Sequence, residues 1–186
     1  MSRASVIGAC AALVSLIGCI PTALSPFYAE DDLVFDPALV GKWVDEDGST
    51  LMFEQSGPKS YTMIEIENNV ESEFKAHLFK IGDLTFLDVF PTEPKCDSGD
   101  YYMLHLLPLH SFLYVTQVEP ELHLSTFDYD WLGKYLDEHP DAIAHTVVES
   151  RIIFTAPTEE LQAFMLEHLE TEGALGEEQV FTKVER

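Results

Sequence analysis

Between residues 41 and 127, apolar and polar side chains alternate in short runs that are separated by turn-forming residues. Asp47-Gly48, Asn68-Asn69 and Gly82-Asp83 each lie between two such runs and are typical of hairpin turns. A period of two gives each run one face for a core and one for solvent, which is the pattern of antiparallel strands. The sequence therefore predicts a β-meander that begins with a hairpin over 41–55 and continues with strands over 61–66, 72–80 and 84–90.

The alternation resumes after a polar loop. We expect further strands over 101–107, 112–119 and 121–127, separated at Pro108 and Pro120, because proline is poorly tolerated in the middle of a sheet.

Segments 127–140 and 157–173 have the period of helices instead, and Asp128 is suited to be the N-cap of the first one. Strands are expected again over 150–156 and 178–184. Because unpaired strand edges promote aggregation, we expect the meander to close. The predicted fold class is mainly β with two helices (α+β), an antiparallel meander closing into a barrel with a late helix packed against it.

The amino-terminal segment has the composition of a secretory signal. Arg3 is the one charged residue before Glu30, and residues 4–20 are apolar or small. This run is shorter than the roughly 20 apolar residues that a membrane-spanning helix needs. At its end, Leu16, Ile17, Gly18 and Cys19 resemble the lipobox of bacterial lipoproteins.

That resemblance implies that a signal peptide of residues 1–18 is removed and that Cys19 carries acyl chains such as palmitate, which anchor the protein to a membrane. Ile20 is similar to the residue that follows the cysteine in outer-membrane members, which implies an envelope location facing the periplasm. We expect 19–36 to be a tether and 37–186 to be the folded domain. The alternative is an ordinary cleaved signal in which Cys19 has no role.

The chain carries a net charge of −23, with 33 acidic and 10 basic residues. Such a surface repels phosphate backbones, so we expect no nucleic-acid partner. It is compatible with basic proteins, and it is also compatible with simple solubility. Cys96 is the one cysteine of the expected domain, in a polar loop with no base beside it, so we interpret it as structural or incidental.

Gly41-Lys42-Trp43, at the head of the first expected strand, resembles the G-x-W opening of the lipocalin and calycin families. The resemblance extends over 37–184 and implies a meander barrel whose tryptophan lies at the closed end. In those families an arginine from the carboxyl-terminal part stacks on that tryptophan. The resemblance therefore implies that Trp43 and Arg151 form a structural pair at the end of the barrel.

Known catalytic and metal-binding motifs are missing from the sequence. Its histidines lack the close spacing of zinc ligands, and there is no nucleophile elbow or phosphate-binding glycine loop. Asp128 and Asp130 beside aromatic residues suggest either a carbohydrate site or a helix cap. We therefore predict no catalytic residues, no metal and no cofactor.

The expected function is a non-enzymatic binding or accessory lipoprotein. The alternative is a structural partner that docks another envelope protein through its acidic surface. An apolar void would favour carriage of a small apolar ligand, whereas a filled barrel would favour docking. The residues expected to face inward, or else their out-of-register neighbours, are Phe53, Met63, Phe74, Leu78, Phe86, Phe90, Leu106 and Phe112.

Overall fold

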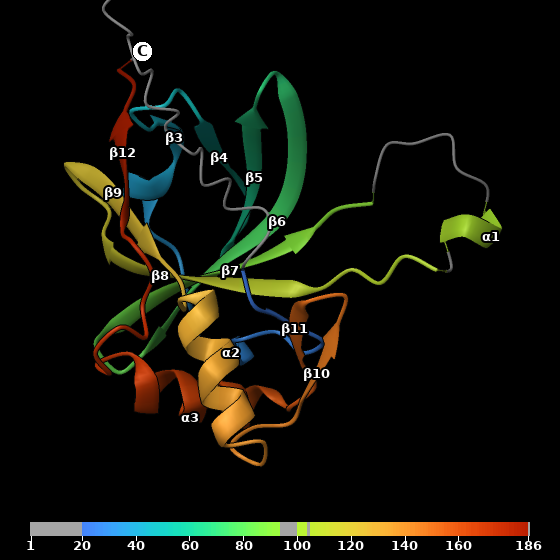
Figure 1. Cartoon of the computed structure of the whole chain (residues 1–186). Helices are drawn as coiled ribbons and strands as arrows, with labels where there is room; N and C mark the ends of the chain where they lie inside the picture. The colour runs from blue at the N-terminus through green and yellow to red at the C-terminus, as the bar shows by residue number, and fades with distance from the viewer. Residues whose placement is uncertain (1–19, 94–99, 104, 186) are drawn as a thin grey trace, which may run out of the picture.

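Eight strands form a closed ring in this computed structural model, which describes residues 20–93, 100–103 and 105–185 (Figure 1). Each strand pairs antiparallel with the next along the chain, and the last strand pairs with the first. The predicted lipocalin-like meander barrel is therefore confirmed. The ring consists of β3 (Gly41–Val44), β4 (Thr50–Gly57), β5 (Ser60–Glu67), β6 (Val70–Ile81), β7 (Leu84–Pro91), β8 (His110–Gln117), β9 (Glu121–Ser125) and β12 (Gln179–Lys183).

The turns between the strands lie where turn-forming residues occur in the sequence. Asn68 and Asn69 connect β5 to β6 with φ angles of 51° and 63°, the left-handed conformation that asparagine tolerates better than most residues. Gly48 and Gly82 also have positive φ, at 91° and 61°. The predicted hairpins are therefore confirmed together with their turns.

The segment that we expected to be a tether is part of the fold. It contains β1 (Thr22–Ala23), which pairs with β8, and β2 (Leu33–Val34), which pairs with β6 beyond the end of β5. Between them Phe27 is fully buried, and its backbone N–H donates to the buried Asp88 carboxylate at 3.0 Å. The tether prediction over 19–36 is wrong for residues 20–36, because apolar side chains of this segment are buried against the barrel wall.

Two helices and a hairpin lie between β9 and β12, and both predicted helices are confirmed. Asp128 caps the first of them, since its carboxylate accepts from the Trp131 N–H at 2.8 Å. The inserted elements are α2 (Tyr129–Glu138), β10 (His145–Val148), β11 (Arg151–Phe154) and α3 (Thr158–His168). Figure 1 shows α2 and α3 together beneath one side of the barrel.

The strand expected over 101–107 is wrong. A short helix, α1 (Asp100–Met103), lies there on an arm that projects from the barrel (Figure 1). Leu106, which we expected inside the barrel, is exposed on this arm. Alternation without a partner strand on either side does not make a strand, because the backbone hydrogen bonds must come from a neighbour.

The barrel wall separates an inner core from an outer one. The outer core fills the space between β6–β8, the two helices and the amino-terminal segment. Phe86 and Phe112 belong to it, and Phe90 packs against His110 on the same outer face with ring centroids 4.4 Å apart, so the out-of-register alternative applies to these three residues and they do not face inward. Their neighbours Leu87, Val89 and Leu113 face inward instead. Along β7 and β8, the aromatic side chains thus belong to the outer core and the smaller aliphatic side chains to the inner one.

Candidate functional site

One end of the barrel is closed by the short helix η3 (Pro37–Leu39), and Trp43 lies beneath it. The indole is fully buried, and its Nε1–H donates to the Leu39 carbonyl at 2.8 Å. Trp43 is therefore at the closed end, where the G-x-W resemblance places it.

The cation on the Trp43 ring comes from Lys183 and not from Arg151. The Lys183 Nζ lies 4.8 Å from the ring centroid and donates to the Ala38 carbonyl at 2.6 Å. Arg151 is exposed at the start of β11, opposite Val148, outside the ring of barrel strands. The predicted pairing of Trp43 with Arg151 is therefore corrected: the last barrel strand supplies the cation, because β12 closes directly against β3.

Tyr61 fastens the segment before η3 to the barrel. Its hydroxyl accepts from the Asp36 N–H at 2.7 Å and donates to the Asp36 carbonyl at 3.0 Å. Phe35 stacks on the same ring with centroids 5.0 Å apart. Burial raises the pKa of Tyr61, so the phenol stays protonated and able to donate.

The interior of the barrel is filled by side chains. Phe53, Met63 and Leu78 face inward as expected and are buried, and Phe74 packs against them. The remaining buried members of this core are Leu39, Trp43, Leu51, Tyr61, Ala76, Leu87, Val89, Val115, Leu122, Leu124 and Phe181. A ligand that occupies the centre of the barrel is excluded by this packing.

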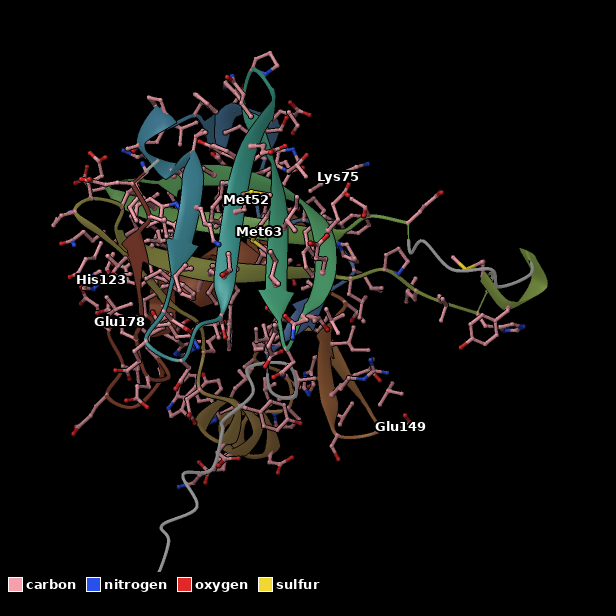
Figure 2. All side chains as sticks on the ribbon, turned by 90° about the horizontal axis from the view of Figure 1, so that it is seen from above. Met52, Met63, Lys75, His123, Glu149 and Glu178 are labelled. Atoms are coloured by element: carbon pink, nitrogen blue, oxygen red, sulfur yellow. The ribbon has the colours of Figure 1, made fainter. Side chains whose placement is uncertain are left out.

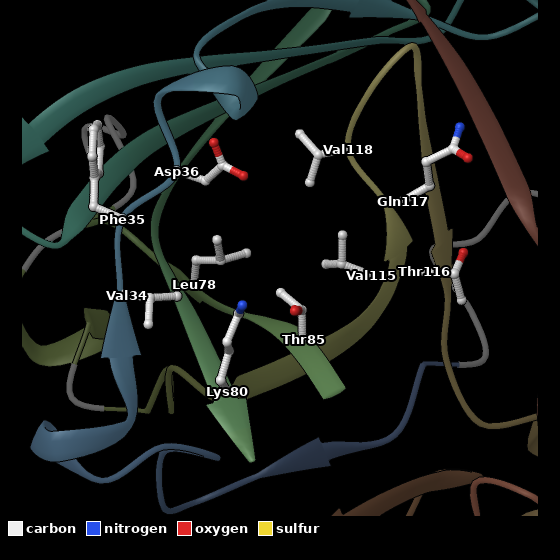
Figure 3. Close-up of a pocket in the computed structure, with 10 residues that line it drawn as sticks. All are labelled: Val34, Phe35, Asp36, Leu78, Lys80, Thr85, Val115, Thr116, Gln117 and Val118. Carbon is white, nitrogen blue, oxygen red and sulfur yellow. The ribbon is translucent and has the colours of Figure 1, made fainter. Parts of the chain in front are cut away.

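A pocket of about 360 Å³ lies beside the η3 cover, at the same end of the barrel (Figure 3). The β2–η3 segment forms one wall, and the end of β8 forms the other. Its apolar lining consists of Val34, Phe35, Leu78, Val115 and Val118, and its polar lining consists of Asp36, Lys80, Thr85, Thr116 and Gln117.

Charged groups from two elements are directed into this pocket. Lys80 and Thr85 are opposite each other on β6 and β7, with the same inward orientation as Leu78. Figure 3 shows the Lys80 ammonium and the Asp36 carboxylate both pointing toward the pocket. The Asp36 carboxylate accepts from the Ala38 N–H at 2.9 Å, whereas no described residue forms an ion pair with Lys80. The pocket thus combines an apolar lining with the Lys80 ammonium, which has no ion-pair partner among the described residues.

Two polar clusters lie on the outside of the barrel. His110 Nδ1 is 2.8 Å from the fully buried Asp88 carboxylate, which also binds the Phe27 N–H. Glu178 accepts a hydrogen bond from Thr116 and lies 2.8 Å from Nδ1 of His123, and these two contacts lower the pKa of its carboxyl group. Figure 2 shows Glu178 beside His123. Both clusters join segments that are distant in sequence, so their role is structural.

The helices enclose a buried histidine. His168 lies among the rings of Trp131, Tyr135 and Phe164, at centroid distances of 5.5, 4.5 and 4.5 Å. Its Nε2 has no hydrogen-bond partner, and burial lowers the pKa of this histidine. Within the described ranges, no group of three or more His, Cys, Asp and Glu side chains could hold a metal ion.

The lipobox residues Leu16, Ile17, Gly18 and Cys19, and also Cys96, lie outside the described residues. None of the helices in the described part of the chain is long and apolar enough to cross a membrane. Comparison with protein-family models, with curated proteins and with solved structures finds no match for this chain. Its site is therefore interpreted from its own residues.

Proposed function

We propose that this protein is a lipid-anchored, non-enzymatic binding module of the cell envelope. Acyl chains on Cys19 hold it to the membrane, and the pocket beside η3 binds one small molecule with an apolar body and an anionic group. The anchoring part of the proposal is supported by the lipobox sequence Leu16 to Cys19 behind a short apolar run.

The observation that supports ligand binding is the pocket beside η3. Its volume of about 360 Å³ is near the lower end of the range of small-molecule sites. Apolar side chains form its floor, and Lys80 supplies an ammonium group without an ion-pair partner in the described residues. In a protein of net charge −23, this cation favours an anionic group of the ligand on the Lys80 side of the pocket, across from the Asp36 carboxylate.

Calorimetric titration of the protein in lipid nanodiscs with hexanoate tests this proposal, with hexanol as the neutral probe of similar shape. We expect hexanoate to bind more tightly than hexanol. Lys80→Gln removes this preference, a loss of about fivefold if the contact contributes about 1 kcal/mol. Lys75→Gln is the matched control, because Lys75 lies on the outer face of the same strand. Equal binding of hexanoate to the Lys80→Gln variant and to the wild type would contradict the proposal.

A second pair of variants tests the position of the site. Thr85→Trp fills the pocket and should abolish binding of both probes. Thr62→Trp places the same side chain on the outer wall of β5 and should leave binding unchanged.

Anchoring has its own test. Mass spectrometry of the mature amino terminus, with palmitate labelling of cells, should show acylated Cys19, and Cys19→Ala should lose both signals. An unmodified mature chain would rule out this part of the proposal.

Docking of another envelope protein is the second candidate, and the filled interior favours it. The β5–β6 hairpin provides an acidic surface for a basic partner. Burial, together with the neighbouring Glu67, raises the pKa of the Glu65 carboxyl group. At the turn of this hairpin, Val70 is 64% exposed. A photo-crosslinker at Val70 in cells would capture one basic protein if this function holds. Glu67→Lys with Glu71→Lys should abolish that product.

A further inference from the structure

The path by which the chain enters the fold restricts where a lipid anchor can be. β1 runs parallel to β11, with Thr22 opposite Ile153 and Ala23 opposite Phe154. In a parallel pair the amino-terminal ends lie at the same edge. The amino-terminal end of β11 is Arg151, directly after the β10–β11 turn. Residues 20 and 21, which precede Thr22, therefore run toward this turn.

The distance from Cys19 to the folded body is short. Three peptide units separate Cys19 from Thr22, a contour of about 10 Å even when fully extended. Pro21 within this stretch is already buried. Acyl chains on Cys19 would therefore bring the edge of the body that carries β1 and the β10–β11 turn to the bilayer surface.

The hairpin at this edge exposes apolar side chains. Val147 and Val148 are 59% and 44% exposed, although they are successive residues on opposite faces of β10. Both project because the hairpin extends beyond the barrel, and Figure 2 shows Glu149 at its far end. We define the hairpin tip as residues 147–151.

A contact with α2 stabilises the backbone conformation of the hairpin tip. Glu149 and Ser150 have φ angles of 48° and 65°, a left-handed conformation that is unfavourable for residues other than glycine and asparagine. The Tyr129 hydroxyl, at the start of α2, donates to the Ser150 carbonyl. A helix thus supports a strained, exposed, apolar turn.

The charge of the tip also differs from that of the whole chain. Glu149 and Arg151 are its charged residues and cancel, whereas the chain carries −23. The tip itself therefore adds no net repulsion from anionic headgroups.

We propose that the tip of the β10–β11 hairpin is a membrane-contacting surface, in which Val147 and Val148 enter the headgroup region beside the acyl chains of Cys19. This inference rests on the proposed lipid anchor. The occupant to which we assign this surface is the phospholipid bilayer itself.

Fluorescence of the full acylated protein in phosphatidylethanolamine–phosphatidylglycerol vesicles tests the inference. A nitrobenzoxadiazole label is attached at Val148→Cys in a Cys96→Ser background, where acylated Cys19 does not react. We expect a blue-shifted emission that is quenched by doxyl-labelled lipids. The matched control is Val70→Cys at the β5–β6 turn, where the valine is 64% exposed, and this label should be neither shifted nor quenched. Adding Val147→Asp should reduce the quenching at Val148→Cys.

Thr146→Cys, another exposed position on β10, serves as the labelling site if Val148→Cys does not fold. An acylated protein whose hairpin label behaves like the Val70 label would overturn this inference while leaving the anchor intact. A blue shift without quenching by doxyl lipids would indicate contact with a second copy or another protein and would also overturn it. An unacylated Cys19 in the same sample, seen by mass spectrometry, would instead refute the proposed function.

Discussion

Replacing Tyr61 by phenylalanine removes a single oxygen atom from the cover of the barrel. That oxygen accepts from the Asp36 N–H and donates to the Asp36 carbonyl, at 2.7 and 3.0 Å. Each hydrogen bond contributes about 1 kcal/mol net, and neither Asp36 group retains this partner in the variant. We therefore expect the free energy of unfolding to fall by about 2 kcal/mol, which corresponds to a decrease in Tm of about 4–8 °C.

Urea denaturation followed by circular dichroism measures this change, and the m value should stay constant because the buried area hardly changes. Tyr114→Phe is the control. Tyr114 is also partly buried in the barrel wall, but its hydroxyl has no hydrogen-bond partner among the described residues, so the change should be below about 0.5 kcal/mol. Since Phe35 and Asp36 also line the pocket, hexanoate should bind more weakly to Tyr61→Phe. An equal effect of the two substitutions on stability would refute the reasoning.

Three further predictions concern stability. Phe27→Ala should lower the free energy of unfolding by about 3–5 kcal/mol, because the ring is fully buried; no measurable loss in urea denaturation would mean that this segment is a tether after all. Lys183→Ala should lower the free energy of unfolding by about 1–2 kcal/mol, because the contacts with Trp43 and the Ala38 carbonyl are lost. Arg151→Ala should lower it by less than about 0.5 kcal/mol. The reverse order would favour the pairing of Trp43 with Arg151. Burial holds the pKa of His168 below that of the unfolded chain, so protonation below about pH 6.5 favours unfolding and stability should fall from pH 7 to pH 5, by at most about 1.4 kcal/mol per pH unit for this group. His168→Phe should flatten that decline in denaturation curves recorded across this range, and an unchanged slope would assign it to other groups.

Local patterns determined the strands, the turns and the helices of this protein. The alternation over 41–90 predicts β3 to β7, because a strand with one buried face must have a period of two. Asn68-Asn69 and Asp128 act within a few residues of their own position. The β5–β6 turn and the cap of α2 can therefore be predicted without knowing any distant contact. The same reasoning predicted Trp43 at the head of β3.

Local patterns failed where the conformation or burial of a residue depends on a segment far away in the sequence. The alternation over 101–107 predicts a strand, but no strand in the described part of the chain pairs with this segment, and residues 100–103 instead form α1. Phe86 and Phe112 alternate correctly but face the helices, since period alone does not say which face of a closed sheet is the inside. A slip of one residue exchanges the two faces.

The candidate site also depends on tertiary structure. Lys80 became a site residue only when β2 paired with β6 and placed Asp36 across the pocket from it. Lys183 reached Trp43 only when β12 closed the ring. The sequence by itself determined which segments form strands and helices, since hydrophobic period and capping act over a few residues. Which side chains share the pocket, and which strand lies beside Thr22, was decided by pairings between segments far apart in the chain, because those contacts have no local signal.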